Sequence, residues 1–249
     1  MSTIVRDTRR GWLMLASFVL AEVTFLSMSL LVLIPFALAS WHAGSGLRLP
    51  GTALVAALVV PTVAAAAVAT TGAALLGQGS LLERLRNQLS VRWRLTDAVI
   101  GLALGVVGMI VTLPAAAFWA RWVGKSQANS AVGDVFDGQR LPLSLALVLF
   151  VGVWLIAPVC EEVLYRGVLW RAMEYWNWNR WVIFGLTTVL FSCAHLELLR
   201  TPLLVVISLP IALARVLTGN LLASVVAHQA NNFLPAVGLL LITQGIFSG

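Results

Sequence analysis

The sequence predicts an all-α fold: a polytopic membrane helical bundle with about seven to eight transmembrane helices. Of its 249 residues, 60% are hydrophobic and 10% are charged, whereas a soluble domain carries about 25% charged residues. The mean hydropathy is +0.94, and the apolar runs are longer than a globular core requires. We therefore expect a single transmembrane domain over residues 1–249, with a catalytic core at about residues 140–240.

Seven segments are long and apolar enough to be membrane helices. The first, about residues 11–39, is too long for the hydrophobic region of a signal peptide, so we interpret it as a retained span. The others are expected at about 52–77, 96–120, 142–165, 181–199, 202–217 and 220–246. Polar interruptions at 177–179 and 218–220 indicate the turns that precede the fifth and seventh helices.

Two stretches between the spans are less apolar. Residues 80–95, SLLERLRNQLSVRWRL, have leucines at helical spacing with arginines between them. This pattern fits an amphipathic helix at the membrane surface, or else an ordinary basic loop. Residues 124–140, GKSQANSAVGDVFDGQR, are rich in Gly, Ser, Asn and Asp and are predicted to form a surface loop.

The charge pattern predicts the orientation of the chain. The net charge of +6 comes from arginines at the ends of the spans, so it indicates lipid contact and topology rather than nucleic-acid binding. With the N-terminus inside, ten basic residues fall on the inner side and five on the outer side. The sequence therefore favours a cytoplasmic N-terminus in the cell's inner membrane. Cys160 and Cys193 both lie within spans, so a disulfide framework is not expected.

Two adjacent carboxylates, Glu161 and Glu162, lie in the apolar stretch LVLFVGVWLIAPVCEEVLYRGVLW. Acids inside membrane spans are costly and usually functional. Arg166 is one helical turn after Glu162, so these two side chains share a face and can pair. Glu161 is rotated by about 100° from Glu162, which leaves it the freer carboxylate and a candidate general base. The alternative is that the whole cluster is an ion-paired staple.

Two of the three histidines, His195 and His228, also lie in apolar segments. Alone, His195 could be a core histidine, and His228 with Asn232 at i+4 could bridge two helices by hydrogen bonds. However, Glu161 and His195 each lie 17 residues from Trp178 in the expected turn, so they have equal height in an antiparallel hairpin. The last helix then brings His228 to nearly the same layer.

An acid with two imidazoles and an amide suits hydrolysis by an activated water. The same groups could bind zinc, since two histidines and a glutamate form a known catalytic zinc set. The zinc motif H-E-x-x-H and the serine-hydrolase motif G-x-S-x-G are both absent from the sequence. A serine nucleophile is therefore disfavoured.

Three short motifs carry a family resemblance. EEVLYR fits EExxxR, FSCAH fits FxxxH and HQANN fits HxxxN, in this order and all on predicted spans. Over about residues 140–240 the chain resembles the CAAX protease and bacteriocin-processing family, also called the Abi family, of glutamate-type intramembrane endopeptidases. Among its members, the bacterial myxosortases have an activity similar to the one expected here, the cleavage of C-terminal tails that sort proteins to the membrane.

The resemblance implies a role for each acid. Glu161 would be the general base and Glu162 its neighbouring second acid. Arg166 would be the residue that orders the motif. The implied activity is that of a hydrolase, an intramembrane protease that needs no cofactor, with zinc as the alternative.

The remaining motif residues would handle the water and the substrate. By the same resemblance, His195 would position the water or the substrate, and His228 and Asn232 would form the oxyanion site. The expected partners are the lipid bilayer and a membrane-anchored protein or peptide that is cut near its C-terminus. The helix heights and the N-in orientation place the site toward the outer face.

Two other functions use the same residues. A membrane transporter could relay protons through the acids and histidines, although no internal repeat is seen to favour it. A non-catalytic immunity protein could retain the pocket without the activity.

Overall fold

The structure is a computed structural model that describes residues 7–42, 49–124 and 130–246. Within these ranges the regular structure is helical, and no strand is present. Six of the described helices are long and apolar enough to cross a membrane, and one further apolar helix, Arg180–Ala194, is shorter. The predicted all-α, multi-pass membrane fold is therefore confirmed.

The first half of the chain contains two long helices and then a short and a long one: α1 (Thr8–His42), α2 (Gly51–Leu76), α3 (Leu81–Gln88) and α4 (Leu95–Val123). The second half contains α6 (Ala131–Phe136), α7 (Leu143–Val151), α8 (Ala157–Glu162), α9 (Trp170–Tyr175), α10 (Arg180–Ala194), α11 (Thr201–Thr218) and α12 (Leu221–Gln244). Two π-helical segments, η1 (Gly152–Ile156) and η2 (Val163–Leu169), separate α7, α8 and α9.

The segment from Leu143 to Tyr175 is one continuous 33-residue rod. It continues well past residue 165, where the sequence analysis placed the end of the fourth span. The two π-helical segments flank α8, which carries Glu161 and Glu162. A π turn adds a residue to a helix and changes the direction of the side chains that follow, and such turns are frequent at functional sites.

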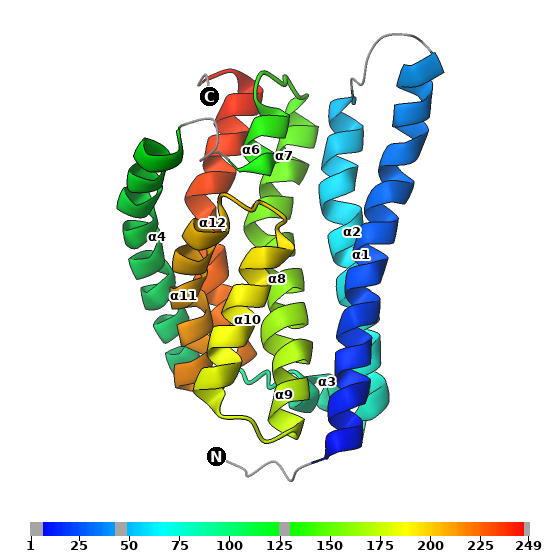
Figure 1. The fold of residues 1–249 in the computed structure, drawn as a ribbon, viewed down its shortest axis with the longest axis vertical. Coiled ribbons are helices and arrows are strands. Elements are labelled where there is room, and N and C mark those ends of the chain that lie inside the picture. Colours follow the sequence, from blue (N-terminus) through cyan, green and yellow to red (C-terminus); the bar gives the residue numbers. More distant parts are fainter. Residues whose placement is uncertain (1–6, 43–48, 125–129, 247–249) are drawn as a thin grey trace.

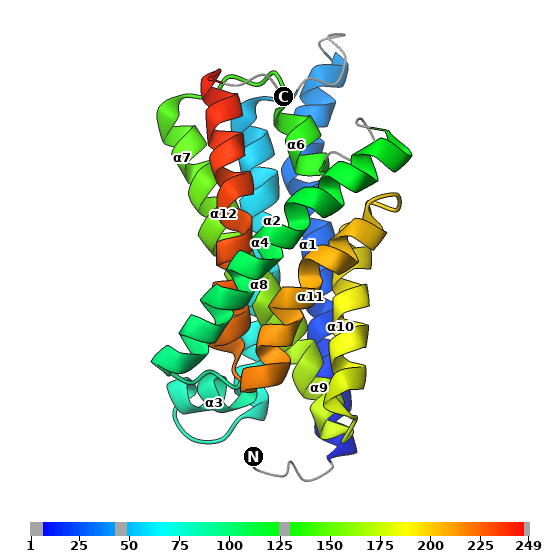
Figure 2. The ribbon, with the colours of Figure 1, turned by 90° about the vertical axis from the view of Figure 1, so that its left-hand side faces the viewer.

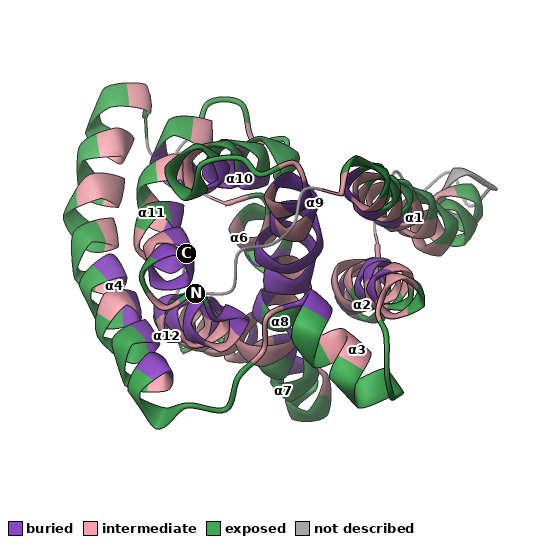
Figure 3. Ribbon diagram, turned by 90° about the horizontal axis from the view of Figure 1, so that it is seen from below, coloured by how far each residue is buried: buried purple, intermediate pink, exposed green. Residues whose placement is uncertain are grey.

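The helices form a bundle with a hairpin at one side. Seen from below, α1 and α2 lie beside α8 and α9, whereas α4 covers α11 and α12 on the opposite side (Figure 3). α4 crosses α11 and α12 obliquely (Figure 2). α1 begins and α12 ends at opposite ends of the bundle (Figure 1), as expected for an odd number of crossings.

Glycines allow α4 to pack tightly against α12. A Cβ atom on Gly101 would lie 2.3 Å from the carbonyl oxygen of Ala223, and one on Gly105 would lie 2.5 Å from that of Ala227. Membrane helices commonly approach each other through small residues in this way, because packing rather than water exclusion holds them together. The contact fixes α12 at the residue that precedes His228.

The short helix α3 confirms the helical interpretation of residues 81–88. Ser80 and Glu83 form a capping box, in which Ser80 N donates to Glu83 Oε2 over 2.8 Å and Glu83 N donates to Ser80 Oγ over 3.4 Å. Ser80 Oγ also donates to Glu83 Oε2 over 2.9 Å. These hydrogen bonds hold the pKa of Glu83 below its ordinary value. Of the polar stretch 124–140, residues 131–136 form α6, and 125–129 lie outside the described residues.

The fifth predicted span is shorter than expected. α10 ends at Ala194 rather than at residue 199. Leu196 has a left-handed backbone with φ of 56°, which is rare for a side chain of this type and stops the helix. His195 therefore lies at the C-terminal end of α10, followed by a turn into α11.

Candidate active site

Glu162 and Arg166 form the ion pair that their spacing predicts. Arg166 Nη1 donates to Glu162 Oε1 over 2.9 Å, and both side chains are 0% exposed. Charges this deeply buried are tolerated only when they are paired and hydrogen-bonded. The guanidinium of Arg166 also lies 4.4 Å from the ring centre of Phe191 on α10.

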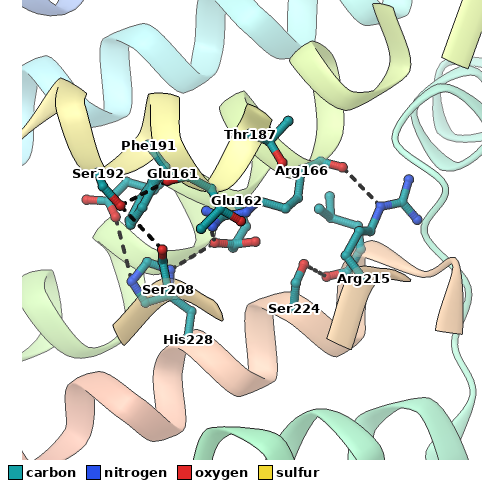
Figure 4. Close-up of polar contacts among 12 residues, drawn as sticks. Glu161, Glu162, Arg166, Thr187, Phe191, Ser192, Ser208, Arg215, Ser224 and His228 are labelled. Carbon is teal, nitrogen blue, oxygen red and sulfur yellow. Dashed lines mark hydrogen bonds and ion pairs between the residues drawn. The ribbon is translucent and has the colours of Figure 1, made fainter. Parts of the chain in front are cut away.

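His228 lies between the two glutamates (Figure 4). Its Nδ1 is 3.0 Å from Glu162 Oε1, and its Nε2 is 3.7 Å from Glu161 Oε2. The same oxygen of Glu162 accepts a hydrogen bond from Arg166. Because this carboxylate is ionised and can only accept, Nδ1 of His228 is the donor of the second hydrogen bond to it. The pair Glu162–Arg166 thus orients the imidazole and leaves Nε2 toward Glu161.

The two adjacent acids have different surroundings. The side chain of Glu161 is 29% exposed, whereas that of Glu162 is 0% exposed. In the described part of the chain, no arginine or lysine forms an ion pair with Glu161, and His228 is its one partner. Glu161 is therefore the more accessible of the two acids, while Glu162 is held by its partners.

The ring of Phe191 contacts both histidines of the site and Tyr165. Its centre lies 4.8 Å from that of His195, 5.7 Å from that of His228 and 5.3 Å from that of Tyr165. His195 thus belongs to the same layer as the glutamates. Its Nδ1 is 2.9 Å from the carbonyl oxygen of Phe191, and no hydrogen bond or ion pair between described residues joins it to either glutamate.

Asn232 lies one turn after His228 but points to a different partner. Its Nδ2 donates over 3.3 Å to the carbonyl oxygen of Val153 in η1. Gln229 donates to Leu155 in the same segment over 3.5 Å. Side chains of α12 therefore hydrogen-bond carbonyl groups of the π-helical segment that precedes α8.

Glu22 on α1 is a third acid near the site that the sequence analysis did not single out. Its Oε1 accepts a hydrogen bond of 2.8 Å from the hydroxyl of Tyr165, and it lies within electrostatic range of Glu161 and His195. Glu22 is the single acidic residue in the first apolar run. The rarity of intramembrane acids could therefore have identified it.

Arg215 is the second residue whose environment differs from expectation. Arg215 is one of the ten basic residues that the topology count assigned to the inner side at the ends of the spans, but it is 2% exposed within α11. Its Nε donates over 3.1 Å to the carbonyl oxygen of Arg166 (Figure 4). The charge count that favoured a cytoplasmic N-terminus therefore loses one of its ten residues.

The site lies near the middle of the rod that carries it, and not close to one end as the helix heights predicted. At 1.5 Å per residue, Glu161 is about 27 Å from Leu143 and about 21 Å from Tyr175. Among the described residues, no three His, Cys, Asp or Glu side chains are grouped so that they could hold a metal ion. One oxygen of Glu162 is already shared by Arg166 and His228, which further disfavours a cation there.

The fold and the site define a multi-pass membrane protein with acids and histidines gathered inside a helical bundle. Residues 143–234, a little over a third of the chain, match the family model described as type II CAAX prenyl endopeptidase Rce1-like. The match confirms the family resemblance predicted from the three motifs, all of which lie within these residues.

A curated relative matches a larger share of the chain, and its name gives no function. An uncharacterized 24.3 kDa protein of Escherichia coli is 27% identical over 151 residues. The aligned region covers 59% of this chain and 62% of the relative, so it spans about three fifths of the relative's length. No solved structure matches this chain.

Proposed function

We propose that this protein is a glutamate-type intramembrane endopeptidase that cuts a membrane-associated protein or peptide near its C-terminus. The observation that carries the proposal is the position of His228. One ring nitrogen is held by the buried Glu162–Arg166 pair, and the other lies 3.7 Å from the less buried Glu161. A structural ion pair alone would not require the second acid or the oriented imidazole.

In the proposed reaction Glu161 removes a proton from a water molecule, whose oxygen then attacks the scissile carbonyl carbon. The carbonyl π electrons move to oxygen. In this step His228 carries a proton on both ring nitrogens, so that Nε2 can donate to the resulting oxyanion together with Asn232. When the C–N bond breaks, the proton held by Glu161 passes to the leaving nitrogen. Asn232 would exchange its bond to Val153 for the oxyanion, and His195 would position the water or the substrate.

No metal takes part in this proposal. The residues support that view because, among those the structure describes, no three His, Cys, Asp or Glu side chains are grouped closely enough to hold a metal ion. The test is to treat the purified protein with a chelator. Cleavage that disappears with chelator and returns with zinc would favour the zinc alternative.

The central test compares wild type with Glu161→Gln, which keeps the shape and removes the base. New N-termini are labelled in membranes from cells that produce either protein, and a peptide spanning one wild-type-dependent site is then used with purified enzyme in liposomes. We expect Glu161→Gln to lower kcat by about 10³-fold or more with an unchanged melting temperature. The exposed acid Glu83 provides a matched control, and the kcat of Glu83→Gln should be close to that of wild type.

The outcomes separate the alternatives. Full turnover by Glu161→Gln would show that the base is wrongly assigned. A protein that cuts nothing but conducts protons across liposomes, and stops when Glu161 is changed, would instead be a proton relay. A protein that does neither would fit the non-catalytic immunity role.

The side of the membrane is tested by labelling. We propose that the N-terminus is cytoplasmic, which places α6 outside and the start of α10 inside. With both native cysteines replaced, Asp137→Cys should react with a membrane-impermeant thiol reagent in intact cells, and Arg180→Cys should not. Both positions are exposed. The reverse pattern would invert the topology and make cytosolic, CAAX-like substrates the better candidates.

A further inference from the structure

Glu22 places a carboxyl group within α1, an apolar helix long enough to cross a membrane. It is the single acid of α1, half-buried in a helix of which little is covered by the rest of the bundle. A carboxyl group at membrane depth is costly unless it has a partner or a role. In the described part of the chain it forms no ion pair, and its hydrogen-bond partner is the hydroxyl of Tyr165 at 2.8 Å.

Tyr165 connects this carboxylate to the site. It lies in η2, directly before Arg166 in the sequence, and is 5% exposed. Its ring packs edge-on between Phe18 of α1 and Phe191 of α10, with centres 5.3 Å apart in both pairs. A buried tyrosine hydroxyl requires a partner, so the bond to Glu22 sets how the ring lies.

The ring of Phe191 contacts Tyr165 and both histidines, so it links the position of Tyr165 to theirs. The centre of the same ring lies 4.8 Å from the ring centre of His195 and 5.7 Å from that of His228. The guanidinium carbon of Arg166 lies 4.4 Å from it. In a close-packed interior, one displaced ring forces its neighbours to shift. A change at Glu22 therefore reaches both imidazoles through two aromatic rings.

We propose that Glu22 is a positioning residue of the active site, acting through Tyr165 and Phe191 on His195 and His228. The inference rests on the proposed function. It assigns a part in the reaction to α1, which lies outside the residues that match the family model. The rival explanation is that the bond merely holds α1 against η2.

The test uses four variants of the full-length protein in liposomes. Glu22→Leu removes the acceptor, Glu22→Gln keeps an oxygen acceptor, Tyr165→Phe removes the donor, and Ser27→Ala changes an exposed position of the same helix. We expect Glu22→Leu and Tyr165→Phe each to lower kcat about ten-fold with KM unchanged, as loss of one such hydrogen bond would. Glu22→Gln should retain most of the activity, and Ser27→Ala all of it.

The double variant Glu22→Leu/Tyr165→Phe should be no slower than either single variant, because both changes remove the same bond. A loss equal to the product of the single losses would overturn the proposal. So would a wild-type kcat in Glu22→Leu. If Glu22→Leu only lowers the melting temperature and leaves kcat per folded molecule unchanged, the bond is merely structural.

A spectroscopic measurement makes the inference independent of cleavage. The chain has three histidines, so ¹⁵N-histidine labelling gives a small set of imidazole signals that His→Gln variants can assign. Glu22→Leu and Tyr165→Phe should shift the signals of His195 and His228 in the same way, and Ser27→Ala should not. Unshifted signals would overturn the positioning role. If wild type cuts nothing, the proposed protease function fails while these signals still decide the positioning.

Discussion

Residues 143–234, which match the family model, and the helices α1 to α4, which precede them, are similar in hydrophobicity but differ in what they bury. The most hydrophobic windows of α1, α2 and α4 have mean hydropathies of 2.2, 2.2 and 2.3, against 2.5, 1.9 and 1.4 for the three long spans from Leu143 onward. Yet eleven of the fourteen buried polar or charged side chains among the described residues lie within 143–234.

This difference shows which part of the bundle holds the buried polar groups. Buried polar groups are costly and must be satisfied within the bundle. In the earlier helices the interior is largely built from small apolar residues, such as Ala65, Ala69 and Ala73 of α2. In the later helices it holds Glu162, Arg166 and His228. Hydropathy locates both regions in the membrane, but burial of polar groups distinguishes the region with the site.

The largest expected effect tests the buried ion pair. Glu162→Gln leaves Arg166 charged and unpaired at 0% exposure. We expect the free energy of unfolding to fall by about 3–5 kcal/mol, measured by SDS denaturation of the detergent-solubilised protein with circular dichroism. Glu161 is the next residue but is partly exposed, so Glu161→Gln should lower the free energy of unfolding by less than about 1 kcal/mol. Equal stability of the two variants would contradict the distinction between the acids.

A middle-sized effect is expected where the two regions meet. A Cβ on Gly105 of α4 would lie 2.5 Å from the carbonyl oxygen of Ala227, directly before His228. Gly105→Ala should therefore cost about 1–3 kcal/mol of unfolding free energy through overpacking, and should lower cleavage by moving α12.

Gly185 of α10 is the matched control, because a Cβ there would meet nothing within 4 Å. Gly185→Ala should be neutral or stabilise by up to about 1 kcal/mol, the difference in helix propensity. Both variants are measured in the same denaturation and cleavage assays. If Gly105→Ala is as stable and as active as Gly185→Ala, the close contact does not position α12.

The smallest effect concerns the exposed acid of the earlier region. The pKa of Glu83 is lowered by its hydrogen bonds with Ser80, so its ionised form stabilises the folded state. That contribution is present above the pKa of the unfolded chain and is lost as the pH falls through the lower, folded-state value. Glu83→Gln should lower Tm slightly at pH 7, and the difference should vanish in acid, as followed by intrinsic fluorescence. A difference that persists at low pH would refute the capping role.

The sequence was sufficient for the motifs and for part of their geometry. The i, i+4 spacing of Glu162 and Arg166 predicted their ion pair, and the equal offsets of Glu161 and His195 from Trp178 predicted that they share a layer. The sequence could not predict the hydrogen bond of Glu22, because Tyr165 lies 143 residues further along the chain and no local pattern links two helices at that separation. The charge count also treated Arg215 as an arginine at the end of a span, although the residue is buried.

The sequence by itself determined the membrane fold, the approximate spans and the set of acids and histidines, because long apolar runs and short helical spacings depend on near neighbours alone. Only the tertiary structure decided that His228 lies between the two glutamates and that α1 contributes a carboxylate through Tyr165. These features depend on the rotation and height of helices packed against one another. The π-helical segments and the close glycine contacts determine this rotation and height, and they form only when the whole bundle packs.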